Sequence, residues 1–136
     1  MHSQFNCFSV PGPPASLTLI NKTESTLKIK WEPPAISNVG IQEYQVSAVP
    51  TSSYSLSSVA LPMEWSFPNS SLQQDLLGLQ SGTNYNVSVR AKSLEGYGTP
   101  VSKIYSTEIG SKELCFMKFF CKNVEWIFLE IYSMIL

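Results

Sequence analysis

A strict two-residue alternation that begins at Tyr85 constrains the fold more than any other feature of the sequence. Tyr85, Val87, Val89 and Ala91 are aromatic or apolar, and the residues between them are polar or charged. Because successive side chains of a β-strand point to opposite faces, this period predicts a strand with one buried and one solvated face. The segment carries no residue arrangement typical of a catalytic site. The alternation therefore predicts a structural strand.

A second alternating segment ends at a pair of prolines. Leu27, Ile29 and Trp31 alternate with charged residues, and Pro33 and Pro34 follow closely. Proline has no backbone N–H and cannot donate to a strand ladder, so the strand is expected to end there. Similar short runs, separated by turn residues, predict further strands at 16–20, 41–49, 59–67, 72–79 and 100–108.

The glycines and the last run allow more detailed expectations. Gly96 and Gly98 follow the first alternating segment, and glycine tolerates the positive backbone φ of a tight hairpin. In the last strand, we expect Val101 or Ile104 to be buried. Residues 15–109 show no helical period. About seven short strands, with turn signals at regular intervals, are typical of an antiparallel sandwich.

Four segments at successive places in the chain carry a family resemblance. They are PGPP at 11–14, Trp31 followed by Glu-Pro-Pro, GIQEYQV at 40–46 and LLGLQSGTNYNVSVRAKSLEGYG at 76–98. Together they make residues 11–110 similar to a fibronectin type III domain. The resemblance implies an all-β, seven-stranded antiparallel immunoglobulin-like sandwich without a disulfide, in which Trp31 fills the core and Tyr85 is the tyrosine corner. The expected core residues are Trp31, Tyr44, Leu79, Tyr85, Val87 and Val89.

The segment LEGYGTPVS at 94–102 is similar to repeats of receptor-type tyrosine phosphatases. The resemblance implies a non-catalytic extracellular protein-interaction or spacer module of a cell-surface receptor or adhesion protein. Its neighbours would be further fibronectin type III repeats, and its other protein partners are not identified by the sequence. The alternative is a truncated isoform of a receptor tyrosine phosphatase whose tail associates with a membrane or a partner.

The composition argues against catalysis. The single histidine is His2, near the N-terminus, which argues against a Ser-His-Asp or Cys-His centre and against a histidine-rich metal site. Asp75 and Glu95 form no evident acid–base pair. We therefore expect no enzyme activity, no catalytic residue, no metal and no cofactor. The net charge of −1, with scattered charges, argues against a nucleic-acid partner.

Both flanks differ in character from the patterned middle. Residues 1–10 are expected to form a flexible N-terminal segment, and residues 111–136 a hydrophobic tail of uncertain structure. Cys7, Cys115 and Cys121 all lie in these flanks, so the sandwich does not depend on an internal disulfide. A Cys115–Cys121 loop, an intermolecular disulfide and free thiols all remain open.

The tail at 111–136 allows three interpretations. A membrane span is disfavoured because Glu125 lies near its middle, where one charge costs about 2.5–3.5 kcal/mol. Apolar residues at helical spacing fit an amphipathic helix on a membrane or on a partner. A replaced C-terminus, as alternative splicing produces, is the favoured interpretation. The first residues lack a visible signal peptide, yet we expect an extracellular or cell-surface location, as part of a membrane receptor.

Asn-x-Ser/Thr sequons favour a secreted protein. They begin at Asn21, Asn69 and Asn86, a mild excess over chance. The alternation turns Asn86 away from the core, and we expect it to be glycosylated in a secretory host.

Loops at one end of the implied sandwich are the candidate contact surface. The resemblance places 36–39 and 94–97 at the same end. Tyr97 is an aromatic residue at a hairpin tip, where it could contact a partner or pack on its own neighbouring strand. Arg90, Lys92 and Lys103 are expected to form a small basic stripe on one sheet, either functional or simply solvated.

Overall fold

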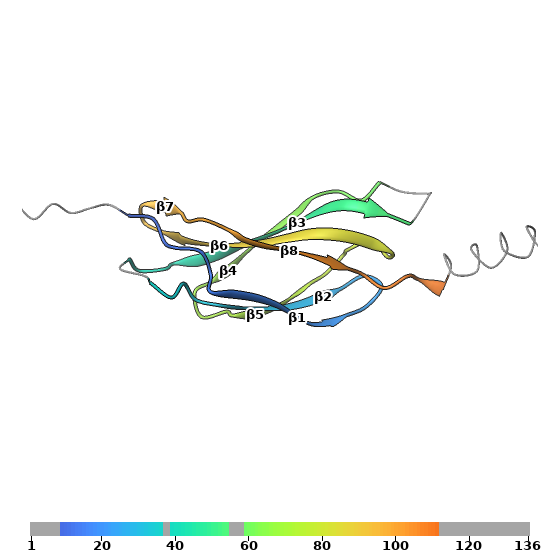
Figure 1. Ribbon diagram of the computed structural model, residues 1–136, viewed down its shortest axis with the longest axis horizontal. Helices are drawn as coiled ribbons and strands as arrows, with labels where there is room; N and C mark the ends of the chain where they lie inside the picture. Colours follow the sequence, from blue (N-terminus) through green and yellow to red (C-terminus); the bar gives the residue numbers. More distant parts are fainter. Residues whose placement is uncertain (1–8, 37–38, 55–58, 112–136) are drawn as a thin grey trace, which may run out of the picture.

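The computed structural model describes residues 9–36, 39–54 and 59–111 (Figure 1). Residues 9–110 of this described part contain no helix. This all-β architecture confirms the predicted fold class. The strands are β1 (Ser16–Lys22), β2 (Leu27–Glu32), β3 (Glu43–Ser53), β4 (Met63–Pro68), β5 (Gln73–Leu76), β6 (Thr83–Ser93), β7 (Gly96–Tyr97) and β8 (Val101–Ser106).

The strands form two antiparallel sheets that lie face to face (Figure 1). The smaller sheet has the order β1-β2-β5. In the larger sheet β4, β3 and β6 are neighbours, and both β7 and β8 pair with β6. The described chain enters at one end of the long axis and leaves at the other (Figure 1).

The last strand of the sandwich is divided into two pieces. In β7, Tyr97 pairs with Lys92, and in β8 the pairing resumes with Val101 opposite Val89. Between them, the Gly98 amide still donates to the Ala91 carbonyl over 2.8 Å. β7 and β8 therefore follow the same edge of β6, and the predicted seven-stranded sandwich is confirmed with its seventh strand interrupted.

The hydrophobic core lies between the two sheets, and β6 supplies its middle. Every odd-numbered residue from Thr83 to Ser93 is buried, and every even-numbered one is partly exposed. The structure places all the expected core residues in the interior. The buried hydrophobic residues are Leu17, Leu27, Ile29, Trp31, Tyr44, Val46, Ala48, Leu76, Leu79, Tyr85, Val87, Val89 and Ala91.

Hydrogen bonds to buried side chains fix the connection that leads into β6. The hydroxyl of Tyr85 accepts a bond of 2.9 Å from the amide of Gln80. Nearby, Thr107 Oγ1 accepts from the Thr83 amide over 3.0 Å and donates to the Gln80 carbonyl over 2.6 Å. These bonds satisfy backbone groups that the turn would otherwise leave unpaired in the interior. Tyr85 therefore has the geometry expected of a tyrosine corner.

The entering chain crosses the segment between β7 and β8 at Gly98, where the two backbones are in close contact. A Cβ atom on Gly98 would lie 2.1 Å from the carbonyl oxygen of Pro11, so only glycine leaves room for this backbone contact. The prediction of a positive φ was wrong for Gly98, whereas Gly96 has a φ of 133° and turns the hairpin as expected. The contact involves residues far apart in the sequence, which explains why the pattern around Gly98 did not reveal it.

The strand expected at 59–67 begins later than predicted. β4 starts at Met63, directly after Pro62, and both Val59 and Leu61 are exposed. Proline cannot donate to the ladder, which is consistent with a strand that begins only after it. The inner face of β4 carries Trp65 and Phe67, which pack against the core.

The register of β8 with β6 determines which residues of β8 face the core. Val101 and Tyr105 pair with the buried residues Val89 and Tyr85, and both pack against the core. Ile104 pairs instead with Asn86 and is largely exposed. Of the two alternatives predicted for burial in this strand, Val101 is therefore the residue that faces the core, and Ile104 faces outward.

Removing the hydroxyl of Tyr85 tests the tyrosine corner. We expect Tyr85→Phe to lower the free energy of unfolding by about 1–3 kcal/mol, because the Gln80 amide loses its buried acceptor. Tyr54→Phe is the control, since its ring is exposed, and it should change stability by less than about 0.5 kcal/mol. Urea unfolding followed by circular dichroism measures both. Equal effects of the two variants would contradict the assignment.

Adding a methyl group at Gly98 tests the crossing of the entering chain. Gly98→Ala should lower the free energy of unfolding by about 1–3 kcal/mol, because the Pro11 carbonyl has to move. At Gly40 an added Cβ meets nothing within 4 Å, so Gly40→Ala should stay within about 0.5 kcal/mol of the unmodified chain. A Gly98→Ala protein as stable as the Gly40→Ala protein would show that the crossing is not tight.

Candidate functional site

One end of the sandwich collects three segments that are distant in the sequence. The entering residues 9–15 pass between the loop after β2 and the β6–β7 hairpin. A Cβ on Gly12 would lie 3.5 Å from the Ile36 carbonyl oxygen, and one on Gly96 would lie 3.9 Å from Val10 Cγ1. The two predicted contact loops therefore lie at the same end, as expected, with the entering chain between them.

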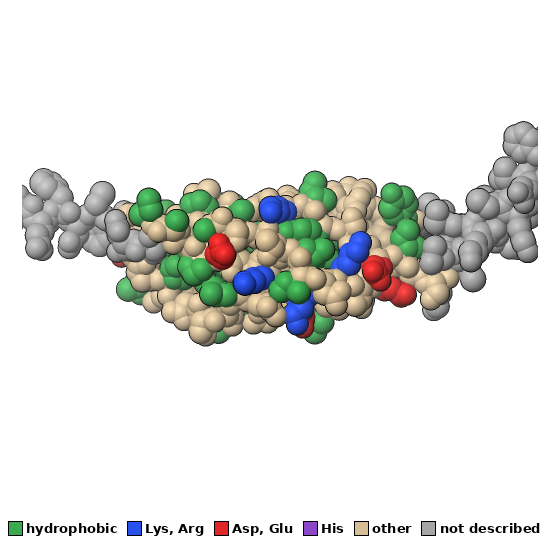
Figure 2. Space-filling model, turned by 60° about the horizontal axis from the view of Figure 1, so that its bottom comes forward, with side chains coloured by type: hydrophobic (Ala, Val, Ile, Leu, Met, Phe, Trp, Pro, Cys, Tyr) green, Lys and Arg blue, Asp and Glu red, His purple; other side chains and the backbone are tan. Residues whose placement is uncertain are grey.

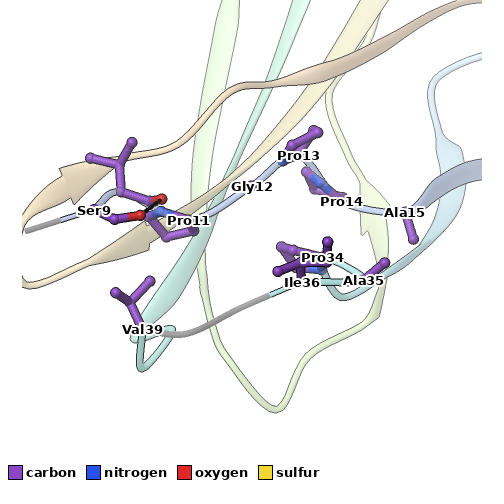
Figure 3. Close-up of a pocket in the computed structure, with 11 residues that line it drawn as sticks. Ser9, Pro11, Gly12, Pro13, Pro14, Ala15, Pro34, Ala35, Ile36 and Val39 are labelled. Atoms are coloured by element: carbon purple, nitrogen blue, oxygen red, sulfur yellow. Dashed lines mark hydrogen bonds between the residues drawn. The ribbon is translucent and has the colours of Figure 1, made fainter. Parts of the chain in front are cut away.

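A shallow groove opens between the entering chain and the loop after β2. It has a volume of about 650 Å³ and is lined by residues 9–15 and 34–36 and by Val39. Figure 3 shows Pro13 and Pro14 on one side of the groove, facing Pro34 and Ile36 on the other. Because prolines restrict the backbone on both sides, the walls are largely preformed. The lining is mostly apolar and offers no arrangement of side chains for catalysis.

Exposed apolar side chains lie on each of the three segments at this end. Val10 and Ile36 line the groove, whereas Leu94 and Tyr97 belong to the β6–β7 hairpin. We use the name N-terminal rim for Val10, Ile36, Leu94 and Tyr97, all of which are large and exposed. Ile36 is 78% exposed and Leu94 is 83% exposed. Isolated exposed apolar residues are common, whereas a contiguous exposed apolar patch is typical of an interaction surface. The two loops could be predicted from the sequence, but Val10 could not, because only the contact between Pro11 and Gly98 brings it to this end.

Tyr97 packs on its neighbouring strand and still presents part of its ring. The guanidinium of Arg90 lies 4.1 Å from the ring centroid, and Lys92 Nζ lies 5.2 Å from it. Tyr97 is 39% exposed. Tyr97 is therefore packed on its neighbouring strand by cation–π contacts, and its contact with a partner stays a prediction.

The cations beside Tyr97 have polar partners on β3. Arg90 Nε donates to Gln45 Oε1 over 2.6 Å, and Lys92 Nζ lies 2.9 Å from Glu43 Oε1. The hydrogen bond from Lys92 to Glu43, together with the negative charge of Glu43, raises the pKa of Lys92. These bonds fix the side chains that support the Tyr97 ring.

The expected basic stripe is wrong. Lys103 pairs with the buried residue Val87, so it lies on the inward-facing side of the edge strand β8, whereas Arg90 and Lys92 lie on the outer face. An inward charge on an edge strand discourages pairing with another sheet. Figure 2 likewise shows charged side chains scattered over the visible face.

The predicted glycosylation sites lie at different places in the fold. Asn21 is exposed in β1, and Asn69 lies in the turn after β4, where its Nδ2 donates to the Ile41 carbonyl over 2.9 Å. Asn86 is partly exposed on the outer face of β6, in agreement with the alternation. Cys7, Cys115, Cys121 and the tail from residue 112 lie outside the described residues.

The described ranges hold neither a candidate metal site nor a candidate membrane-spanning helix. Residues 9–36, 39–54 and 59–111 contain no group of three His, Cys, Asp or Glu side chains that could hold a metal ion. Nor does this part of the chain include a helix that is long and apolar enough to span a membrane.

Solved structures with the same fold are similar over most of this chain. The FN5 domain of Drosophila Lar is 22% identical, with a TM-score of 0.59, and the match covers 74% of this chain and 100% of that domain. The fn3 domain of the human collagen alpha-1(XX) chain is 27% identical, with a TM-score of 0.59, over 76% of this chain and 90% of that one. A segment of chicken tenascin with two fibronectin type III domains is 25% identical, with a TM-score of 0.60, over 73% of this chain and 51% of the segment.

The sequence comparisons identify the family. No curated protein sequence matches the chain. The family model for the fibronectin type III domain, however, matches residues 12–108. Domains of this family are generally non-catalytic, commonly mediate protein–protein contacts or act as spacers, and typically occur in extracellular or cell-surface proteins. With its fold, its core and this match in agreement, the chain belongs to the fibronectin type III family.

Proposed function

We propose that residues 11–110 form a non-catalytic protein-interaction module that contacts another extracellular protein domain through the N-terminal rim. The observation that supports this most directly is that exposed apolar side chains lie on all three segments that meet at this end, two of them lining the groove. Burying one such side chain in an interface contributes about 1.5–3 kcal/mol, so a few of them suffice for specific binding.

The rim is also held in place before any partner arrives. Arg90 and Lys92 support the ring of Tyr97, and the crossing of Pro11 over Gly98 holds the entering chain next to the β6–β7 hairpin. A preformed surface loses less conformational entropy on binding than a flexible one. This favours the rim over the sheet faces as the contact surface.

A spacer function is the second candidate. The described chain enters and leaves at opposite ends of the long axis, so the domain lengthens any protein into which it is inserted (Figure 1). The chicken tenascin segment contains two such domains in one chain, which supports neighbouring repeats in a parent protein of this chain as well. In such an array, the N-terminal rim would face the preceding domain.

We further infer that the parent protein is a cell-surface receptor or an adhesion protein. The sequons support passage through the secretory pathway. The likeness of residues 94–102 to repeats of receptor-type tyrosine phosphatases supports the receptor context, with any phosphatase activity in another domain. Association of residues 111–136 with a membrane or a partner belongs to this proposal and concerns residues outside the described part.

A matched pair of leucine variants tests the interaction surface. The chain is screened by biolayer interferometry against a panel of purified extracellular domains that includes fibronectin type III domains. We expect a binder whose affinity falls about tenfold or more in Leu94→Ser, because the rim loses an apolar contact. Leu77→Ser is the control, since Leu77 is 60% exposed but follows β5, near the β1–β2 turn at the other end.

The outcomes of this screen separate the two candidate functions. Affinity that falls equally in both variants would contradict the rim as the contact surface. A panel without any binder would contradict the interaction function and leave the spacer function as the better account.

A further inference from the structure

An isolated apolar pair flanks Asn86 on the outer face of the larger sheet. In the strand register, Asn86 of β6 lies between Val49 of β3 and Ile104 of β8. Val49 is 43% exposed and Ile104 is 66% exposed, although they lie in the middle of paired strands. Along β6, the next outward-facing residue, Ser88, has serines on both sides, Ser47 and Ser102. The row through Asn86 is therefore apolar on both sides, whereas the row beside it is polar.

The neighbouring asparagine on the same strand, Asn84, has hydrogen-bond partners on both adjacent strands. Asn84 is flanked by Ser52 and Ser106. Its Nδ2 donates to Ser52 Oγ over 2.8 Å, and its Oδ1 accepts from the hydroxyl of Ser106. Among the described residues Asn86 has no such partners, because the side chains of Val49 and Ile104 carry no donor or acceptor. Among the described residues, its side-chain amide makes no hydrogen bond.

We propose that Asn86 carries an N-linked glycan whose first N-acetylhexosamine packs its apolar ring face on Val49 and Ile104. Asn86, Val87 and Ser88 form the acceptor sequon. The donor is an oligosaccharide carried on a polyprenyl diphosphate. Asn86 Nδ2 loses one proton and bonds to the sugar C1, while the C1–oxygen bond to the diphosphate breaks and the polyprenyl diphosphate leaves.

The sugar matches the surroundings of Asn86 in shape and chemistry. A pyranose ring presents C–H groups on its faces and hydroxyl groups at its edge, so it covers an apolar pair while remaining solvated outside. The sugar thereby removes from water the two exposed aliphatic side chains that the sheet leaves uncovered. A glycan on the central strand also keeps other proteins away from this sheet, which leaves the end of the domain for binding.

The other sequons lack this setting. At Asn69, the amide nitrogen is bonded to the main chain of Ile41. Asn21 lies in β1, at the edge of the smaller sheet, where it faces Lys28. Asn86 is therefore the sequon at which a glycan would become part of the folded surface.

The proposal rests on the extracellular placement given above, and its test is independent of that placement. The full chain is expressed behind an added signal peptide in mammalian cells and secreted. Enzymatic deglycosylation in heavy-oxygen water, followed by peptide mass spectrometry, reports which asparagines were modified. We expect Asn86 to be occupied. An unmodified Asn86 in the secreted protein, with or without occupancy at Asn21, overturns the proposal and leaves the binding screen unaffected.

The packing of the sugar is tested by the effect of the glycan on thermal unfolding. Two states are compared. In one, the secreted protein is trimmed to a single N-acetylglucosamine, and in the other, Asn86→Gln removes the glycan at Asn86. We expect the single sugar to raise the unfolding midpoint by about 2–4 °C. In the Val49→Ser/Ile104→Ser variant, which keeps the sequon, the same comparison should give a shift near zero. Equal shifts in both backgrounds would overturn the packing of the sugar on this pair.

Discussion

The packing of Trp31 between the two sheets is the interaction on which the rest of the structure depends. Its side chain is completely buried, and its ring lies 5.6 Å from Tyr44 and 6.2 Å from Phe67, both in the opposite sheet. The indole Nε1 finds no hydrogen-bond acceptor among the described residues. Since an unpaired buried donor is unfavourable, the large apolar area of the ring must outweigh that cost. Trp31 therefore holds the sheets together through packing.

The ends of the sandwich are fixed by different contacts, and this difference leads to the functional proposals. At one end, Tyr85 and Thr107 satisfy the buried backbone of the turn into β6. At the other, Pro11 crosses Gly98 and brings Val10 next to the β6–β7 hairpin. The first end is closed by polar bonds within the domain. Leu77 and Tyr54 are exposed near the first end, but at the second end exposed apolar side chains lie on all three segments that meet there, which makes it the surface that we propose for a partner.

The sequence predicted those features that depend on local pattern. The alternation in β6 was sufficient to predict which of its residues are buried, and the resemblance identified Trp31 and Tyr85. Features set by contacts between distant segments could not be found in this way. Only glycine fits at position 98, because a Cβ there would meet the carbonyl oxygen of Pro11. Lys103 lies on the inward-facing side of β8 because of its register with Val87. The apolar pair beside Asn86 likewise emerges only when three strands are aligned.

The stability of variants at Trp31 tests the central claim most directly. Denaturant unfolding of the whole chain should show that Trp31→Ala loses about 3–5 kcal/mol, or does not fold, whereas Trp31→Phe folds with a smaller loss of about 1–3 kcal/mol. The exposed variant Ile36→Ala should stay within about 0.5 kcal/mol of the unmodified chain. A Trp31→Ala protein that folds with a loss below about 1 kcal/mol would contradict the account, because the sheets would then be held together by other contacts.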